Sequence, residues 1–275
     1  MPLDVLGFPA ALDAAPELDF IRNYGAPFAV WTRPDRGLLC LGVEGPRYGR
    51  LLIRFAGAAV TGGIPPQAAV SHLRGALPAY EALYGHPALI RLQGHGPAAG
   101  GYMAIFRWAE GCSLDQEEAR AQLRRQPLLT RLRMMDSVVD FHLHALARGY
   151  VSVGFSDASL IADLGLGTVT IGDIDFYRPL PAVNDMGRMV GSVRFLSPEE
   201  YQLGAALDER TVQYTLGALA FFFFGEYGSR ERPAWTAGEA LYQVAARACQ
   251  EQRDRRYPTL SAFAAAWREA AGRTV

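Results

Sequence analysis

Short apolar runs separated by turn-forming residues fill the first part of the chain. The runs cover 28–31, 38–43 and 50–55, and they are separated by Pro-Asp-Arg-Gly at 34–37 and Glu-Gly-Pro at 44–46. Turn residues placed between apolar runs favour antiparallel strands joined by tight connections. The pattern therefore predicts three consecutive antiparallel strands.

A helical pattern follows these strands, over about 66–84, and Pro78 is expected to kink or divide that helix. Two more strands are predicted over 89–92 and 102–108. Residues 1–27, interrupted by prolines, are expected to form an N-terminal extension that packs on the N-terminal lobe. The first part of the chain is thus predicted to be a small sheet with one helix.

The periodicity becomes mainly helical after Gly111. Apolar residues recur at every third or fourth position over 128–147, which predicts a long helix. Two short strands return at 160–161 and 169–171. The segments expected to be helical after Pro198 are 199–203, 211–224, 237–250 and 260–271.

Strands that come first and helices that come later predict the α+β class. The expected organisation is one two-lobed domain. It comprises the extension 1–27, an N-terminal lobe over 28–110 and a C-terminal lobe over 111–275, with a hinge within 107–111.

Composition narrows the classes of function. The chain has 275 residues, is half apolar and has a formal net charge of −1. This near-neutral charge gives no electrostatic reason to expect nucleic acid or an anionic membrane as a partner. The apolar runs are too short to span a bilayer, the N-terminus has no signal-peptide pattern, and Cys40, Cys112 and Cys249 lack metal-ligand spacing. A cytoplasmic location with reduced thiols is the expectation.

One segment has a more specific pattern. Residues 191–199 read Gly-Ser-Val-Arg-Phe-Leu-Ser-Pro-Glu. They resemble the end of a protein-kinase activation segment, which commonly reads Gly-Thr-x-x-Tyr-x-Ala-Pro-Glu. Other segments resemble protein-kinase motifs in the family's order, over roughly 28–267. They are 50–54 (third strand), 86–90 (His-Pro-Asn-Ile), 105–111 (hinge strand), 149–163 (catalytic loop), 171–175 (Asp-Phe-Gly), 214–217 (Tyr-Ser-Leu-Gly) and 255–259 (Arg-Tyr-Pro-Ser).

This resemblance implies a two-lobe protein kinase-like fold, with ATP and Mg²⁺ as cofactors. It implies that Glu199 pairs with Arg256 and ties the activation segment to the C-terminal lobe. The nucleotide contacts that it implies are Arg54, Phe106, Trp108, Ser159 and Asp173, of which Ser159 and Asp173 would hold the metal.

The sequence departs from the family in the N-terminal lobe. The third-strand Lys is replaced by Arg54, which is larger and planar. The expected partner Glu falls near Leu77, and Glu81 would reach Arg54 only if Pro78 shifts the helix. The first hairpin offers one glycine, so Arg33 and Arg36 either bind phosphate by charge or are ordinary solvated turn residues.

The catalytic loop departs further. Ser152, Val153 and Gly154 occupy the His-Arg-Asp positions, and Ser159 replaces the metal-binding Asn. The Asp of the central helix that normally braces this loop is Val212. Because the brace and the motif are absent together, a rebuilt loop is favoured over random decay.

Two acids are left as candidates for chemistry. Asp157 is interpreted either as the catalytic group or as a turn residue bonded to its own backbone. Asp173 is the expected Mg²⁺ ligand. Asp175 competes with it, because Ile174-Asp175-Phe176 resembles the Ile-Asp-Trp of aminoglycoside-type phosphotransferases. His142 and His144 are expected to be packing or surface residues.

Three functions remain open at this point. The first is a bacterial-style serine/threonine protein kinase-like enzyme that works through a rearranged loop. The second is a pseudokinase that acts as a binding or scaffold module for a regulatory protein. The third is a small-molecule phosphotransferase, which the activation-segment ending at 192–199 disfavours.

Overall fold

A computed structural model describes residues 2–226 and 229–274. The chain forms two compact units: the first contains the residues up to Tyr84 together with Ile90–Ala109, and the second contains Gly85–Leu89 and the residues from Glu110 onward. The described residues form six α-helices and mainly antiparallel strands, so the class is α+β, as predicted.

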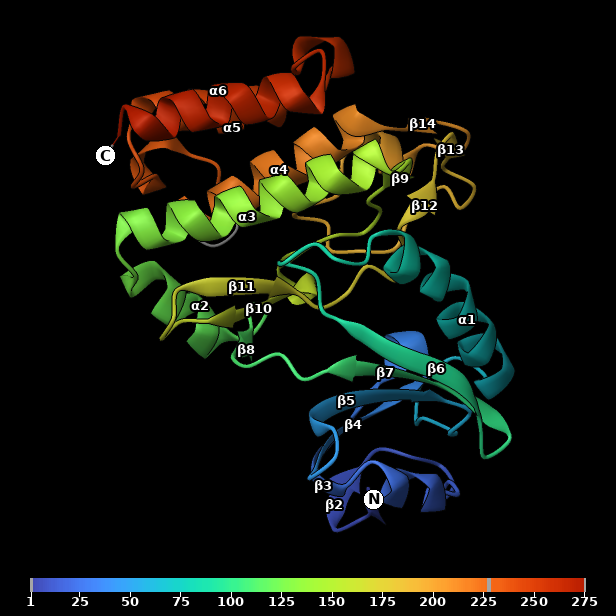
Figure 1. Ribbon diagram of the computed structural model, residues 1–275. Helices are drawn as coiled ribbons and strands as arrows, with labels where there is room; N and C mark the ends of the chain where they lie inside the picture. The colour runs from blue at the N-terminus through green and yellow to red at the C-terminus, as the bar shows by residue number, and fades with distance from the viewer. Residues whose placement is uncertain (1, 227–228, 275) are drawn as a thin grey trace. The chain divides into compact units, whose positions relative to one another are not determined.

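The first unit is built on a five-stranded antiparallel sheet (Figure 1). The strands predicted over 28–31, 38–43, 50–55 and 102–108 are confirmed, whereas the strand predicted over 89–92 begins only at Leu92. Leu89 instead forms a bridge with Ile171, whose amide donates to the Ala88 carbonyl. In sheet order the strands are β3 (Ala26–Arg33), β4 (Leu38–Gly45), β5 (Gly49–Ala56), β7 (Gly101–Arg107) and β6 (Leu92–Ala98).

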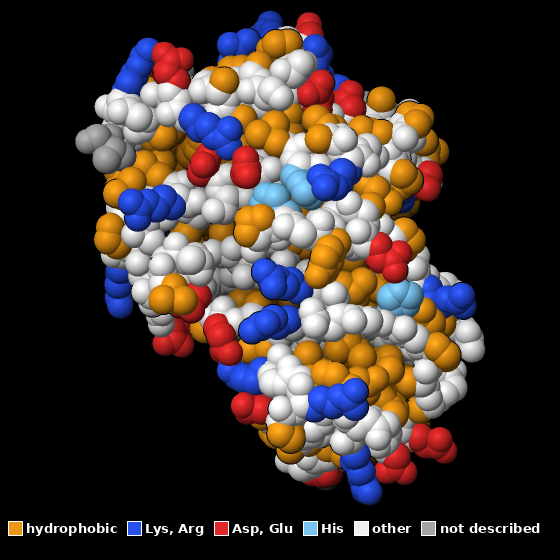
Figure 2. Space-filling view, viewed as in Figure 1, with side chains coloured by type: hydrophobic (Ala, Val, Ile, Leu, Met, Phe, Trp, Pro, Cys, Tyr) orange, Lys and Arg blue, Asp and Glu red, His pale blue; other side chains and the backbone are white. Residues whose placement is uncertain are grey.

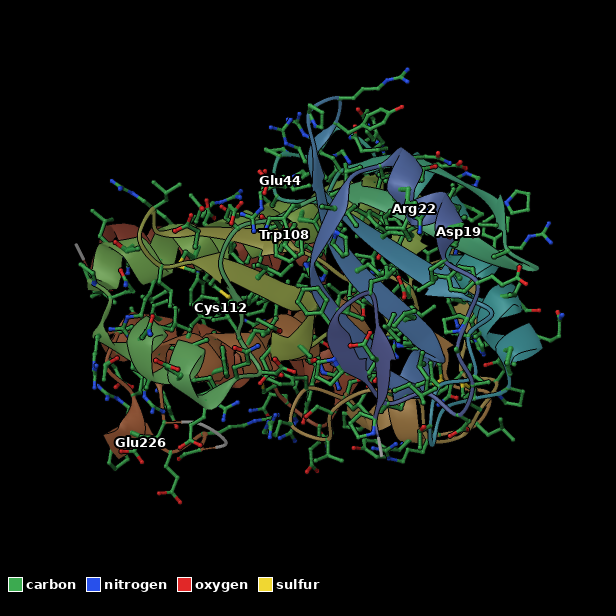
Figure 3. All side chains as sticks on the ribbon, turned by 90° about the horizontal axis from the view of Figure 1, so that it is seen from below. Asp19, Arg22, Glu44, Trp108, Cys112 and Glu226 are labelled. Atoms are coloured by element: carbon green, nitrogen blue, oxygen red, sulfur yellow. The ribbon has the colours of Figure 1, made fainter. Side chains whose placement is uncertain are left out.

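The N-terminal residues pack on one face of this sheet. They form the hairpin β1 (Leu3–Val5) and β2 (Phe8–Ala10), followed by a 3-10 segment, Asp19–Asn23. Val5 and Ile21 share one buried cluster with Leu39 and Leu41 of β4 and with other apolar residues of the sheet. Asp19 and Arg22, labelled in Figure 3, form an exposed ion pair on that segment. Alternation along the strands thus gives this face a core, because successive side chains point to opposite sides.

Helix α1 (Pro66–Ala82) contacts β5 and β7. It remains one helix through Pro78, so the expected division does not occur. Leu73, Leu77 and Tyr80 recur at helical spacing and are buried.

The second unit is mainly helical. Its helices are α2 (Glu117–Arg125), α3 (Leu128–Ala147), α4 (Glu209–Phe224), α5 (Glu239–Ala248) and α6 (Leu260–Gly272). Helix α4 is almost wholly buried, and it contacts α3, α5 and α6 (Figure 1). A helix that is apolar on every side belongs in a core, which explains its position at the centre of this unit.

Short strands connect these helices. The strands β8 (Cys112–Ser113), β10 (Leu160–Asp163) and β11 (Thr168–Ile171) form a three-stranded antiparallel sheet in the order β11-β10-β8. Two small pairs follow: β9 (Tyr150–Val151) with β12 (Arg178–Pro179), and β13 (Ala182–Val183) with β14 (Ala206–Leu207). The helix predicted at 199–203 is a single 3-10 turn, Pro198–Tyr201.

Surface charge agrees with the near-zero net charge. On the face shown in Figure 2, acidic and basic side chains are interspersed. Within the described ranges, none of the helices is long and apolar enough to cross a membrane.

Candidate functional site

Arg54 lies on β5, two residues before its end, and is buried. Its Nη1 donates to the Tyr80 hydroxyl at 3.1 Å, and its guanidinium carbon lies 4.9 Å from the centroid of the Phe106 ring. Phe106, on β7, is fully buried and lies 5.0 Å from the Tyr80 ring. Because the sequence contains no lysine, arginine is the only long basic residue type available for this strand. Arg54 is held here by aromatic groups of the same unit.

The acid considered as a partner for Arg54 is used elsewhere. Glu81 makes an ion pair with Nε2 of His95 at 2.9 Å, while Nδ1 of His95 lies 2.7 Å from the Tyr102 hydroxyl. Tyr80, one residue earlier on α1, accepts a hydrogen bond from Arg54. The helix continues through Pro78, and Glu81 pairs with His95.

The hairpin arginines are tied to one acid. Asp35 accepts hydrogen bonds from Arg33 at 3.3 Å and from Arg36 at 3.1 Å. Partial burial alone would raise the pKa of Asp35, but the hydrogen bonds and charges of the two arginines outweigh it and lower that pKa. Gly37 closes the turn with φ of 62°, and an added Cβ would lie 2.8 Å from Ala69 Cβ. Of the two open interpretations, this favours a local turn over a phosphate cradle.

Trp108, labelled in Figure 3, belongs to an aromatic cluster in the first unit. We define the cluster as Phe28, Trp31 and Trp108, with the Arg50 guanidinium 4.4 Å from the Phe28 ring and 5.1 Å from the Trp108 ring. Gly42 leaves room for it, because a Cβ there would lie 2.7 Å from Phe28. Period-two alternation puts Arg50 and Arg54 on one face of the sheet. Trp108 is thus packed against side chains on the face to which the resemblance assigns a nucleotide.

Gly154, which the resemblance aligns with the family's catalytic Asp, is tightly enclosed. Its φ is 65°, and an added Cβ would lie 2.6 Å from the Val190 carbonyl oxygen. Its amide donates to the Glu200 carboxylate at 3.4 Å. No larger residue fits here without a shift of the backbone around Val190.

Asp157 is buried in the same loop, in the 3-10 turn Asp157–Ser159. Its Oδ1 accepts from the Ala158 amide at 3.1 Å, and its Oδ2 contacts Nη2 of Arg194 at 3.4 Å. Only 2% of the Asp157 side chain is exposed, against 37% of Arg194. The bond from the Ala158 amide is the contact that the turn interpretation expects, and the contact with Arg194 comes in addition.

Ser159 and Asp173 lie where two strand ends meet, since the Gly172 amide donates to the Ser159 carbonyl at 2.8 Å. The Ser159 hydroxyl accepts from the Ser156 amide and completes a capping box, and Asp173 Oδ1 accepts from the Asp175 amide at 3.0 Å. Mg²⁺ prefers several oxygen ligands, usually including one or two carboxylates. Across residues 2–226 and 229–274, no group of three or more His, Cys, Asp or Glu side chains is placed to hold a metal ion. One carboxylate beside nucleotide phosphates is enough for Mg²⁺, so Asp173 stays the predicted ligand.

Glu199 and Arg256 form a bidentate ion pair. The distances are 2.7 Å from Nη1 to Oε1 and 3.0 Å from Nη2 to Oε2, and both side chains are buried. Thr211 and Arg253 also contact the carboxylate. Burial would raise the pKa of Glu199, yet the hydrogen bonds and charge of Arg256 lower it overall. The pair that the resemblance implied is therefore present and fully enclosed.

Glu200 is the residue that the sequence reasoning missed. It is buried, and its Oε2 accepts from the Ser197 amide at 2.7 Å and from the Ser197 hydroxyl at 2.9 Å. Its Oε1 accepts from the Gly154 amide, so it joins the loop to the end of the segment before α4. Burial raises the pKa of Glu200. The spacing Ser197-x-x-Glu200 is a capping box, a signal that could have identified it.

His142 and His144 both contact neighbouring residues of the second unit. Nδ1 of His142 lies 2.8 Å from the Val138 carbonyl and Nε2 lies 2.9 Å from the Tyr177 hydroxyl. Complete burial lowers the pKa of His142 to about 4, so the imidazole is neutral at pH 7. His144 lies 2.9 Å from Nη1 of Arg148. Both agree with the packing and surface interpretation.

No protein-family model matches this sequence, and no curated protein matches it either.

Proposed function

We propose that this chain is a protein kinase-like binding module that does not transfer phosphate. Gly154 carries the proposal. At this position, which the resemblance assigns to the catalytic carboxylate, a side chain would collide with the Val190 carbonyl. Phosphoryl transfer needs a group that orients the acceptor hydroxyl, and glycine has none.

The neighbouring acid supports the same conclusion. Asp157 is buried and contacts Arg194, so using it as a base would require the loop to rearrange. The Glu199–Arg256 pair supports the kinase-like part of the proposal, because it is the pair that the resemblance implies for a two-lobe fold. A scaffold with this pair and without an acceptor-orienting group fits a binding role.

The test is transfer of labelled γ-phosphate from ATP, with Mg²⁺ or Mn²⁺, to the protein itself and to general protein substrates. We expect no transfer above an enzyme-free blank. Transfer that disappears in Asp173→Asn, while this variant stays folded, would support the active, rearranged-loop function instead.

Nucleotide binding is a separate question. Weak Mg²⁺-dependent binding of ATP stays a prediction from the resemblance, through Arg54 and Asp173. Calorimetry and thermal shift with and without Mg²⁺ measure this binding. A millimolar dissociation constant corresponds to roughly 4 kcal/mol of binding free energy. No response at millimolar ATP in either condition would contradict the prediction that this chain binds ATP.

A further inference from the structure

A hollow of about 290 Å³ lies in the second unit beside the C-terminal half of α4. Phe221 and Phe222 of α4 form one wall. Arg194 and Phe195 line it from the segment before α4, and Arg230 lines it from the segment after α4. It is therefore a small space with two guanidinium groups and three aromatic rings.

Arg230 is half-buried and bonded only to neutral groups. Its Nη1 donates to the Tyr214 hydroxyl at 2.9 Å, and its Nη2 donates to the Arg194 carbonyl at 3.0 Å. Among the residues that the structure describes, no carboxylate lies within ion-pair distance of Arg230. Hydrogen bonds to two neutral oxygens replace only part of the hydration that a partly buried cation loses, so an anion at this point would be stabilised.

Arg194 supplies a second guanidinium, which forms an ion pair with Asp157. Asp157 Oδ2 lies 3.4 Å from Nη2 of Arg194, and more than a third of the Arg194 side chain is exposed. The other described residues that line the hollow carry no formal charge. Its lining is therefore net positive even after Asp157 is counted.

The chemistry of the lining defines the ligand. Guanidinium groups match carboxylate and phosphate oxygens in a planar, two-bond geometry. The aromatic wall suits an apolar neighbour of that anion. At about 290 Å³ the hollow is just below the usual range for enclosing a whole small molecule, but it accommodates one or two side chains.

We propose that this hollow binds an acidic peptide segment, through a carboxylate or phosphate next to an apolar residue. The proposal deepens the binding role proposed above and rests on it. Because peptide binding is measured without ATP, its failure is distinguishable from failure of the phosphate-transfer test.

The experiment uses the full chain and three short labelled peptides, measured by fluorescence polarisation and calorimetry. Their centres are Glu-Phe, phosphoserine-Phe and the neutral Gln-Phe. We expect the two anionic peptides to bind with millimolar or tighter affinity and the neutral peptide to bind at least tenfold more weakly. The ratio between the two anionic peptides identifies carboxylate or phosphate as the preferred group.

Variants locate the binding. Arg230→Gln should weaken binding of the anionic peptides at least tenfold, and Arg230→Lys should weaken it less because the charge stays. Arg232→Gln is the matched control, since Arg232 is exposed and already paired with Glu239, and it should change nothing. Melting temperatures establish that each variant is folded.

Asp157→Asn gives the sharpest result, because it removes the acid that competes for Arg194. It should tighten peptide binding severalfold, whereas Arg194→Gln should weaken it even if Arg230→Gln fails to fold. Three outcomes would each overturn the proposal. They are no binding at millimolar peptide, equal binding of charged and neutral peptides, and equal effects of Arg194→Gln and Arg232→Gln.

Discussion

Two buried carboxylates of the second unit each face an arginine, in very different ways. Glu199 and Arg256 make two short bonds, and neither side chain is exposed by more than 3%. Asp157 Oδ2 lies 3.4 Å from Nη2 of Arg194, and 37% of the Arg194 side chain is exposed. The first contact has the geometry of a fixed structural tie, and the second has that of a contact that can be broken.

The difference separates a residue that holds the fold, Glu199, from a residue considered for catalysis, Asp157. Glu199 lies where the resemblance implies a pair with Arg256, and its surroundings supply two further partners, Thr211 and Arg253. Asp157 lies beside Gly154, where the resemblance expects a catalytic group and the space is filled by the Val190 carbonyl. A chain can thus resemble a family in the groups that hold its fold while differing in the groups that would carry its reaction.

The largest expected loss of stability comes from removing one partner of the Glu199–Arg256 ion pair. Glu199→Ala should lower the free energy of unfolding by about 3 kcal/mol, because it leaves Arg256 buried without an opposite charge. Chemical denaturation measures it. Glu239→Ala, which removes an exposed partner of Arg232, is the control and should leave the midpoint almost unchanged. Equal midpoints for both variants would mean that the pair is not the tie described here.

His142 and Glu199 are expected to lose their contributions to folding stability over different pH ranges. His142 has a folded pKa of about 4 because of burial, below its ordinary 6.5. Its contribution is present above pH 6.5 and is lost as pH falls toward 4, by roughly 3 kcal/mol over that range. Glu199 also has a lowered pKa, so its contribution is lost only as pH falls below its ordinary 4.5.

Denaturation at several pH values checks this order. His142→Gln should flatten the loss between pH 6.5 and 4.5, whereas His72→Gln, at an exposed position, should leave the slope as it is. A slope that is unchanged in His142→Gln would contradict the neutral, buried state of this imidazole.

A smaller effect is expected at Gly154. Gly154→Ala and Gly149→Ala both put a side chain at positive φ, at 65° and 75°, but only at Gly154 does the new Cβ meet the backbone. Gly154→Ala should therefore destabilise by about 2 kcal/mol more than Gly149→Ala, the range for overpacking. Equal losses would show that the loop has room for a side chain and would weaken the proposed function.

The smallest effect is the coupling between Asp157 and Arg194. A double-mutant cycle with Asp157→Asn and Arg194→Gln should give about 1 kcal/mol or less, because the arginine is solvated and the geometry is long. The corresponding cycle for Glu199 and Arg256 should give a clearly larger coupling. Similar couplings would remove the distinction between the two contacts.

The sequence predicts some elements well because their signals are local. Helix α3 spans Leu128–Ala147, as its apolar periodicity indicates, and the strands around the early turns are found for the same reason. The strand expected at 89–92 is misplaced because the backbone at Ala88 pairs with Ile171, more than eighty residues later. No local pattern contains that information.

The candidate site divides in the same way. The Glu199–Arg256 pair was predictable from motifs, and Glu200 was visible as a capping box with Ser197. The enclosure of Gly154 by Val190, the contact of Asp157 with Arg194 and the position of Arg230 were not predictable. Each depends on residues 36 or 37 positions apart meeting in the folded chain.

The central claim is that the loop around Gly154 leaves no carboxylate free to orient an acceptor. The most direct measurement is γ-phosphate transfer by the wild type, Asp157→Asn and Asp173→Asn under identical conditions, with folding confirmed for each. The account predicts no transfer by any of the three. Transfer by the wild type that falls roughly 100-fold in Asp157→Asn, as loss of a general base does, would contradict it.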